Sequence, residues 1–391
     1  MQETILERVG VELPIRTPED GEGEYEILVG HTPRHLSQAV NPPTASLEFA
    51  VASDGKKVAL EGEYFLIAAA AYYFIYHYIP DRFFDSQVPE EIQTCTPVTH
   101  PVKSIMFLIG DGMGFEQTML VGSQHPGADY PDDPATFYGY RLPYRGQVRT
   151  GSISGTTDSA ASGTALACGI KTINRYVAKN VSREDALSIT ELAASLGKAT
   201  AVMSTEDSTG ATVACFSSHA KDRNDDKDIL AGQDKMAQEH GTLIVCDFEA
   251  MEPKATAFRE PLLQTLEALE ASENGFFLMY EEAYIDKNAH KRNVQGCFEA
   301  MVRFQQAIGL FMEYACYHPD TLVLITADHE TGGLTQIQDG SFTFTGTEHT
   351  SAEVPLFVFG RGGEMFQNFQ DENNKIPQML VTLWGVTQFG E

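Results

Sequence analysis

The sequence is poor in basic residues. Its 391 residues include 27 Lys and Arg against 55 Asp and Glu, which gives a formal net charge of −28 at pH 7. A nucleic-acid backbone or an anionic membrane surface is bound through basic patches, so this charge balance argues against both partners. A small anionic substrate remains open, because bound divalent cations can reverse the local field.

Closely spaced cysteines are also missing. The sequence has no Cys-x-x-Cys motif and no pattern typical of a disulfide framework, and we expect free, buried thiols. The six cysteines are Cys95, Cys168, Cys215, Cys246, Cys297 and Cys316.

Neither a signal peptide nor a membrane span is expected. The first residues, MQETILERVG, lack a basic region followed by an apolar one, so the compartment stays undetermined. The longest apolar run is YFLIAAAAYYFIYHYIP, residues 64–80. It is slightly short for a membrane span, contains several tyrosines and a histidine, and ends at a proline. It therefore predicts a buried or amphipathic helix.

The first hundred residues have a pattern of their own. YEILVG (25–30) predicts a strand, and LEFAVASDGKKVALEG (47–62) predicts a hairpin that turns at Ser53-Asp54-Gly55. A stretch with Pro89, Pro97 and Pro101 follows and suggests a linker. We expect a small α+β accessory region over residues 1–98, followed by a catalytic domain over residues 99–391.

From Ser104 onward, apolar runs alternate with helical patterns. The runs are near-continuous, as in strands that are buried on both faces. They are SIMFLIG, KATAVMS, GTLIVC, GFFLMY, DTLVLITA and VPLFVFG. Helices are expected over 186–197, with Gly197 as the C-terminal cap, and over 298–315, with an apolar stripe. This alternation predicts an α/β fold with a doubly wound, mostly parallel central sheet and helices on both faces.

One stretch, TDSAASGTALACGIKT (157–172), places an Asp-Ser pair before a run of very small residues. Asp158 or Ser159 can cap a structural helix whose small residues permit close packing. Alternatively, Ser159 is a nucleophile at a helix N-terminus, where backbone N–H groups hold an anion. Taken alone, the stretch favours the structural helix start, and the rest of the chain is needed to decide.

Acidic residues and histidines follow three of the expected strands. Because ligands of such sheets gather at the carboxyl ends of the strands, we expect these side chains to meet. Several buried carboxylates at one edge repel one another unless cations neutralise them. Imidazole with carboxylate is typical of zinc, and oxygen ligands alone suit magnesium. The residues are Asp111, Glu281, Asp286, His290, Asp328 and His329.

Five motifs together resemble the alkaline phosphatases. They occur in that family's order between Ser104 and Gly360, while the first hundred residues lie outside the resemblance. The motifs are GDGMG, TDSAASGTA with the following G-x-KT, the E, ID and H of the segment 281–290, TADHETGG, and EHTSAEVPLFVFG. A sixth segment, GATVACFSSHAKDR, is similar to the family's stretch that ends in His-x-x-x-Arg.

The resemblance implies a hydrolase of small phosphate monoesters that works through a phosphoserine. Ser159 would be the nucleophile, and Arg223 would clamp the phosphate oxygens through its planar fork. The implied cofactors are two Zn²⁺ and one Mg²⁺. The implied ligands are Asp286, His290 and His349 for the first zinc; Asp111, Asp328 and His329, together with Ser159, for the second; and Asp111, Thr212 and Glu281 for magnesium.

Two positions depart from the family's pattern. Relatives often have Asp or His two residues before the magnesium-binding threonine, where this chain has Gly210. The missing side chain predicts a weakened magnesium site, unless another residue such as Asp207 or Lys287 fills the role. Lys287, directly after Asp286, can either reach the phosphate through water or be solvated.

Other functions share parts of this pattern. A phosphodiesterase, a sulfatase or a phosphomutase of the same superfamily would share the metal ligands, although the DSAAS context argues against a sulfatase. A non-catalytic metal or phosphate binder is the alternative from a different class. The sequence leaves the oligomeric state open, including a homodimer.

Overall fold

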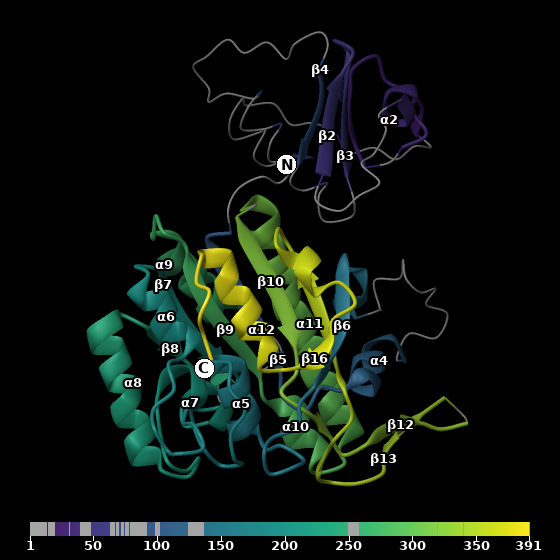
Figure 1. Cartoon of the computed structure of the whole chain (residues 1–391). Coiled ribbons are helices and arrows are strands. Elements are labelled where there is room, and N and C mark those ends of the chain that lie inside the picture. The colour runs from purple at the N-terminus through teal and green to yellow at the C-terminus, as the bar shows by residue number, and fades with distance from the viewer. Residues whose placement is uncertain are drawn as a thin grey trace. The chain divides into compact units, whose positions relative to one another are not determined.

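The structure is a computed structural model, and it divides into two compact units. One contains residues 1–100 and 312–320, and the other contains residues 101–311 and 321–391. Figure 1 shows the chain and labels its elements. The structure describes residues 20–30, 32–39, 48–62, 92–97, 102–123, 137–248, 258–318, 320–338 and 340–390, together with the single positions 14, 67, 70, 71, 74 and 78.

The smaller unit contains a four-stranded sheet in the order β1-β3-β2-β4. Its strands are β1 (Glu26–Val29), β2 (Glu48–Ser53), β3 (Lys57–Gly62) and β4 (Ile92–Pro97), with the short helix α2 (His35–Ala39) between the first two. The expected strand and hairpin are confirmed, and β2 pairs with β3 in antiparallel register. At the turn, the Asp54 carboxylate accepts hydrogen bonds from the N–H groups of Lys56 and Lys57.

Pro97 and the helix expected over residues 64–80 are the two remaining features of this region. Pro97 was expected in a linker, but it ends strand β4 and lies opposite Glu48 of β2. A proline is tolerated there because β4 is an edge strand. Most of the helix expected over 64–80 lies outside the described residues, and its described positions 67, 70, 71, 74 and 78 are helical.

The larger unit is built on an eight-stranded sheet in the order β16-β6-β15-β10-β5-β9-β7-β8. Strands β10, β5, β9, β7 and β8 run parallel, while β15 is antiparallel to both of its neighbours. The predicted doubly wound, mostly parallel sheet is therefore confirmed. The strands are β5 (Ser104–Gly110), β6 (Tyr144–Arg149), β7 (Ala199–Ser204), β8 (Leu243–Val245), β9 (Phe276–Glu282), β10 (Thr321–Thr326), β15 (Val354–Phe359) and β16 (Gln370–Glu372).

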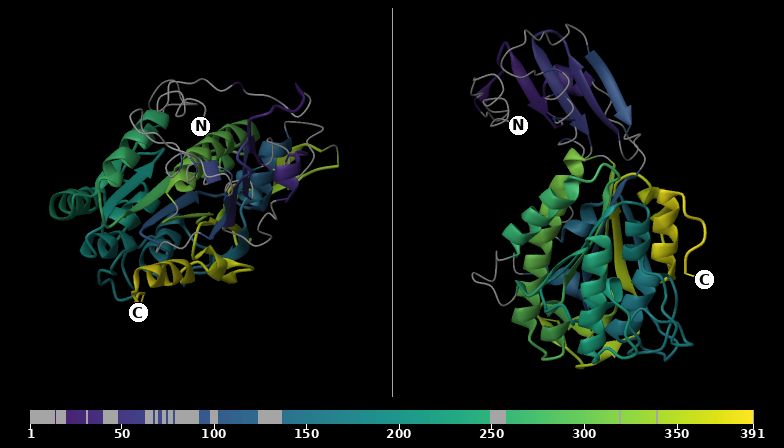
Figure 2. Two further views of the ribbon diagram at one scale, coloured as in Figure 1. Left: turned by 90° about the horizontal axis from the view of Figure 1, so that it is seen from above. Right: turned by 90° about the vertical axis from the view of Figure 1, so that its left-hand side faces the viewer.

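Helices cover both faces of this sheet, as the right-hand view in Figure 2 shows. Side chains that alternate along β9 reach opposite layers. Tyr280 packs against Phe304 and Phe311 of one helix, and Phe277 packs on the other face against Phe216. The helices are α4 (Phe115–Ser123), α5 (Ser159–Cys168), α6 (Ile189–Ser195), α7 (Ala211–Ser217), α8 (Asp226–His240), α9 (Arg259–Glu270), α10 (Tyr284–Ala289), α11 (Val294–Tyr317) and α12 (Lys375–Leu380).

The remaining strands are short and follow β10. They form the pair β11 (Glu330–Thr331) with β14 (His349–Thr350) and the hairpin of β12 (Leu334–Gln336) with β13 (Phe342–Phe344). Short 3-10 helices cover Tyr138–Arg141, Gly363–Phe366 and Val381–Trp384. The hairpin projects from the body of the larger unit in Figure 1.

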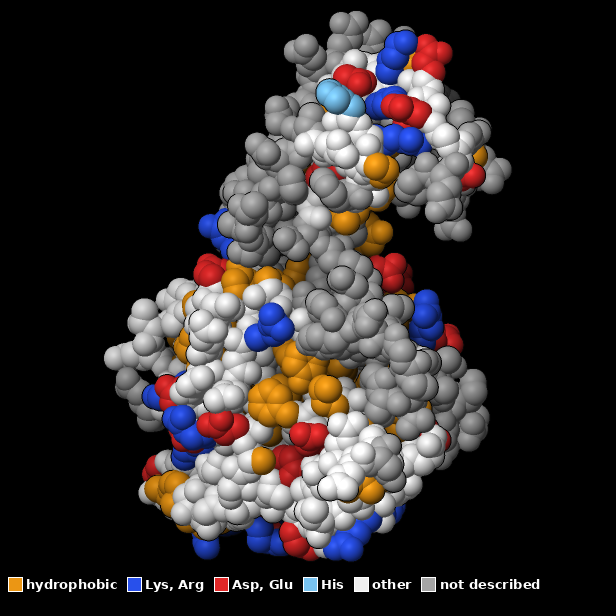
Figure 3. All heavy atoms as spheres, turned by 90° about the vertical axis from the view of Figure 1, so that its right-hand side faces the viewer, with side chains coloured by type: hydrophobic (Ala, Val, Ile, Leu, Met, Phe, Trp, Pro, Cys, Tyr) orange, Lys and Arg blue, Asp and Glu red, His pale blue; other side chains and the backbone are white. Residues whose placement is uncertain are grey.

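Surface and thiol features agree with the composition. On the face drawn in Figure 3, Lys and Arg side chains are interspersed with Asp and Glu rather than gathered into one area. Among the helices that the structure describes, none is both long enough and apolar enough to cross a lipid bilayer. Cys168, Cys215, Cys246 and Cys297 are free thiols, and all except Cys246 are buried.

Candidate active site

Ser159 is the first residue of helix α5, and its hydroxyl faces the polar edge of the sheet. The preceding Asp158 caps the helix, because its side chain accepts a hydrogen bond from the Ala161 N–H. Ser159 is 4% exposed, and its Oγ lies 3.2 Å from His329 Nε2. The structural interpretation of this stretch is confirmed for Asp158, while the nucleophilic role of Ser159 stays a prediction. Asp158 starts the helix, and Ser159 lies at its N-terminus, where N–H groups can hold an anion.

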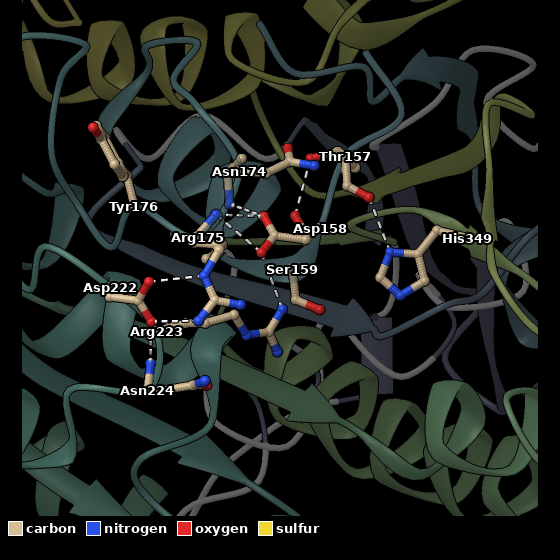
Figure 4. A network of polar contacts seen from close by, with 12 residues as sticks. Thr157, Asp158, Ser159, Asn174, Arg175, Tyr176, Asp222, Arg223, Asn224 and His349 are labelled. Atoms are coloured by element: carbon tan, nitrogen blue, oxygen red, sulfur yellow. Dashed lines mark hydrogen bonds and ion pairs between the residues drawn. The ribbon is translucent and has the colours of Figure 1, made fainter. Parts of the chain in front are cut away.

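Arg223 lies beside this helix N-terminus. Its Nη1 is 3.3 Å from Asp158 Oδ2, and Figure 4 shows its guanidinium directed toward Ser159. The Asp158 carboxylate also accepts from the Arg175 N–H at 3.0 Å, and the Arg175 side chain forms two bonds to Asp222. Asp158 thus caps α5 and holds Arg223 at the same time. The Arg223 side chain is 30% exposed, so an anion can reach it.

Asp111 and Glu281 reach the site from adjacent parallel strands. Asp111 directly follows β5, and its N–H donates to the Glu282 carbonyl at 3.1 Å. Glu281 lies in β9 and accepts a hydrogen bond from Ser204 at the end of β7. The next residue along β9, Glu282, points to the opposite face and is bound by Arg303 at 2.6 Å. Glu281, and not Glu282, is therefore available as a ligand.

Gly112 permits a close approach at this edge. Its φ is +77°, a conformation that glycine adopts without steric cost. A Cβ at this position would lie 2.9 Å from the Asp286 Cα. The glycine therefore lets the turn after β5 pack directly against helix α10, which carries Asp286.

Asp286, His290 and His349 converge on one point. His290 Nε2 lies 3.2 Å from Asp286 Oδ2 and 3.2 Å from His349 Nε2. His290 Nδ1 bonds to the Thr347 carbonyl, and His349 Nδ1 bonds to the Thr157 carbonyl at 2.9 Å. Because the carbonyls engage both Nδ1 atoms, the two Nε2 atoms face Asp286 and each other, where a metal ion would take the place of a proton. These three residues form a group with metal-ligand geometry.

His349 owes its position to a short strand pair. It lies opposite Thr331 in the antiparallel pairing of β14 with β11, two residues beyond His329. The rings of His329 and His349 consequently stack with their centroids 3.6 Å apart. The length of the loop between the two histidines therefore does not determine where His349 lies.

Asp328 and His329 follow β10 and are completely buried. His329 Nε2 lies 3.1 Å from Asp328 Oδ2 and 3.6 Å from Asp111 Oδ1. Asp111 and His329 also group with Asp286, so Asp286 lies between the two predicted zinc sites. The resemblance implies Asp286 as a ligand of the first site alone.

Thr331 links the two groups. Its hydroxyl donates to Asp286 Oδ1 at 2.5 Å, and Oγ1 lies 3.2 Å from His329 Nδ1. Because the single hydroxyl proton goes to Asp286, Oγ1 accepts from the Nδ1–H of His329. That tautomer leaves His329 Nε2 free.

Four predicted ligand atoms are buried without a hydrogen-bond partner. They are Asp111 Oδ1, Thr212 Oγ1, Glu281 Oε1 and Asp328 Oδ2. A buried oxygen without a partner costs free energy, so these atoms point to ligands such as metal ions. Thr212 lies in helix α7 and is completely buried. The residues present therefore fit the implied metals.

The acid–base properties of these groups agree with this interpretation. Burial, and then the charge of Asp328, raises the pKa of Asp111 well above its usual range. Burial works against ionisation of Asp286, yet the hydrogen bond from His290 lowers the pKa of Asp286 to about 2. The same hydrogen bond raises the pKa of His290 to about 9. The cluster holds more carboxylates than its histidines can neutralise, which is the environment that divalent cations stabilise.

The region around Gly210 differs from expectation. Gly210 has no side chain, but the carboxylate of Glu206 occupies the adjacent space. Lys287 is not simply solvated. It forms an ion pair with Glu206, and its Nζ lies 2.5 Å from Glu206 Oε2. Asp207, which the sequence suggested as a substitute for a side chain at position 210, does not occupy this space. Asp207 is exposed and bonds to the N–H and hydroxyl of Thr209 instead.

The fold and the site together define a class. An α/β sheet that presents a carboxylate and imidazole cluster beside an N-terminal helix serine is the arrangement of a metal-binding hydrolase. The chain belongs to the alkaline phosphatase family, whose sequence model matches residues 102–249 and 247–344.

Individual relatives share this assignment. Alkaline phosphatase 4 of Bacillus subtilis is 27% identical over 290 residues, which cover 60% of this chain and 62% of that protein. The Escherichia coli alkaline phosphatase is 25% identical over 406 residues, covering 72% and 86% of the two chains. The chain thus spans slightly less than two thirds of the length of the Bacillus relative.

Solved structures agree in fold. The alkaline phosphatase of the Antarctic bacterium TAB5 has a TM-score of 0.61 and is 25% identical, covering 74% of this chain and 99% of that one. A variant of that enzyme, in which a histidine is replaced by aspartate, has Mg²⁺ bound in its M3 site. The variant has a TM-score of 0.60 at 25% identity, with the same coverage.

Proposed function

We propose that this protein hydrolyses phosphate monoesters through a phosphoserine intermediate on Ser159, with two Zn²⁺ and one Mg²⁺ as cofactors. The observation that carries the proposal is the position of the Ser159 hydroxyl. It lies at a helix N-terminus, 3.2 Å from His329 Nε2 and beside the guanidinium of Arg223. A nucleophile, a metal-ligand cluster and an anion clamp thus converge on one point.

The ligand chemistry supports three metal sites. Asp286, His290 and His349 offer one carboxylate and two Nε2 atoms, which suits zinc. Asp111, Asp328 and His329, together with the Ser159 hydroxyl, would hold the second zinc.

The third site would be formed by oxygen atoms alone, from Asp111, Thr212 and Glu281, which suits magnesium. The Mg²⁺ bound in the M3 site of the structural relative supports this choice.

The residues of the chain have distinct roles in the reaction. When bound, the metals would lower the pKa of the attacking hydroxyl and stabilise charge on the leaving oxygen. Ser159 Oγ loses its proton to solvent and forms a bond to phosphorus as the bond to the ester oxygen breaks. The alcohol leaves with a proton from water. A water molecule then cleaves the phosphoserine, releasing phosphate and regenerating Ser159.

The groups around Ser159 favour a doubly charged phosphoryl group. The fork of Arg223 meets two oxygens at once, and the free N–H groups at the start of α5 add further donors. Asp158 keeps Arg223 in place through the 3.3 Å contact. A monoester presents the free oxygens that this arrangement requires, whereas a diester has one fewer.

The test compares an aryl phosphate monoester with its diester and sulfate analogues, with and without Zn²⁺ and Mg²⁺. The monoester should be turned over fastest, and chelation should abolish turnover. Ser159→Ala should lower kcat by several orders of magnitude, as removal of a nucleophile does, while zinc content is largely kept. Ser182→Ala, at an exposed serine, is the matched control and should keep the wild-type rate.

Two results would overturn the proposal. One is a diester or sulfate ester that is hydrolysed faster than the monoester. The other is the absence of phosphate on Ser159 in protein quenched in acid during turnover, because the covalent intermediate would then not exist.

A further inference from the structure

A carboxylate fills the space beside Gly210. A Cβ built on Gly210 would lie 1.9 Å from Glu206 Oε1 and 2.4 Å from its Cδ. Gly210 is the N-cap of helix α7, which carries Thr212 two residues later. Any side chain at position 210 would therefore displace the carboxylate of Glu206 from the start of this helix.

Glu206 is held in this place by Lys287. The two side chains form an ion pair at 2.5 Å, with Glu206 12% and Lys287 36% exposed. The ammonium group also lies 4.8 Å from the centre of the Tyr284 ring. Because Lys287 directly follows Asp286 in helix α10, the pair connects the loop after β7 to the helix that supplies a zinc ligand.

The same loop is bonded to Glu281. The Glu206 N–H donates to Ser204 Oγ at 3.1 Å, and that hydroxyl donates to Glu281 Oε2 at 2.6 Å. The Thr205 N–H donates to the Glu281 carbonyl at 3.1 Å.

The position of Glu206 requires an explanation, because its loop bonds through Ser204 to a second carboxylate, that of Glu281. Lys287 neutralises Glu206, but Glu281 Oε1 and Thr212 Oγ1 remain buried without a hydrogen-bond partner. A hydrated divalent cation at those two oxygens would use a neighbouring carboxylate to bind its waters. Gly210 supplies no such group, and Glu206 lies where one is needed.

We propose that Glu206 is the positioning residue of the magnesium site, where its carboxylate orders the water ligands in place of a side chain at position 210, and that Gly210 is required to make room for it. The inference rests on the third metal site of the proposed function. It reverses the expectation that Gly210 leaves this site incomplete.

The first test measures Mg²⁺ binding by titration calorimetry on the zinc-loaded protein. Glu206→Gln keeps the size of the side chain and removes its charge, so Mg²⁺ affinity should fall by roughly 10- to 100-fold. Asp207→Asn removes a neighbouring, exposed charge and should leave the affinity unchanged. Wild-type affinity in Glu206→Gln would overturn the inference while leaving the third site intact, whereas no Mg²⁺ binding by the wild type would overturn both.

The variant Lys287→Gln distinguishes two roles for Glu206: ordering the water ligands of the metal, or only forming the ion pair with Lys287. If Glu206 only paired with Lys287 to stabilise the fold, the two Gln variants would behave alike. If it orders the metal's waters, removal of the cation should leave Mg²⁺ affinity equal to or above that of the wild type, because the carboxylate is then unopposed. A loss in Lys287→Gln that equals the loss in Glu206→Gln would count against the inference.

An exchange of positions gives the sharpest result. Gly210→Asp alone should weaken Mg²⁺ binding, because the new side chain collides with Glu206. The double variant Glu206→Ala with Gly210→Asp should recover most of the affinity that Glu206→Ala loses. Tighter binding in Gly210→Asp alone would show that the glycine leaves a real gap and that Glu206 does not fill it.

Discussion

Thr331 offers the most demanding test of how the site is assembled, because one hydroxyl contacts both groups of proposed zinc ligands. It donates to Asp286 at 2.5 Å and lies 3.2 Å from His329 Nδ1. Thr331→Val keeps the shape of this completely buried side chain and removes only the hydroxyl. The substitution should therefore disturb the ligands without opening a cavity.

The expected size of the effect follows from the bond that is lost. A hydrogen bond to a charged carboxylate contributes about 1.5–3 kcal/mol. A change in a group that orients metal ligands lowers affinity by roughly 10- to 100-fold, which corresponds to about 1.4–2.7 kcal/mol. The lost hydrogen bond and the expected fall in metal affinity therefore correspond to free energies of the same magnitude. Both zinc equivalents should be affected, the first through Asp286 and the second through His329.

Competition with a zinc chelator of known affinity measures this loss directly. Thr335→Val, at a partly exposed threonine in β12, is the matched control and should bind zinc as the wild type does. Nitrogen NMR of the histidines in the metal-free wild-type protein should show His329 protonated at Nδ1. Wild-type zinc affinity in Thr331→Val, or a His329 proton fixed on Nε2, would refute the reasoning.

Two further predictions concern single histidines. His349→Ala should lose one zinc equivalent in metal analysis, and full zinc occupancy would show that His349 is not a ligand. His219 donates to Glu191 at 2.9 Å, and both side chains are about one-fifth exposed. Burial opposes the charge of His219, but the pairing with Glu191 raises the pKa of His219 above 6.5. The stabilisation is therefore complete below pH 6.5 and lost as the pH rises through the raised value. His219→Gln should cost about 1 kcal/mol in urea unfolding at pH 6 and less at pH 9, whereas an equal cost at both would exclude the ion pair as its source.

The sequence predicts the parallel core of the sheet well. Strands such as β5, β9 and β10 are buried on both faces, so their apolar runs are unbroken and easily recognised. The sequence does not predict the last two strands at one end of the sheet, β6 and the edge strand β16, because YRGQVR and QDE alternate or lack apolar residues. They depend on pairing with β15 and with each other, which a local pattern does not reveal.

The candidate site is predictable where residues follow strands directly. Asp111 and Asp328 follow β5 and β10 and could be placed in this way, since parallel strands end at one edge, whereas Glu281 lies inside the last residues of β9 rather than after it. Glu206 and Thr331 could not, because their roles depend on contacts with Lys287 and Asp286 that lie 81 and 45 residues away in the chain. Gly210 shows the limit most clearly. The sequence reveals a missing side chain there, whereas only the structure reveals which neighbour uses the space.

The pairing of β11 with β14 holds His349 in place independently of the segment between the two strands. Thr331 faces His349, so two residues of pairing hold this predicted ligand in place, while the hairpin of β12 and β13 lies outside that pairing. At the tip, Gly340 and Ser341 fold back on Ile337 through backbone bonds of 2.9 and 2.8 Å. Lengthening the chain between Ile337 and Ser341 would leave the histidine where it is. The tip of the hairpin should therefore tolerate the insertion of a recognition loop or a reporter sequence without a change in the positions of the predicted metal ligands.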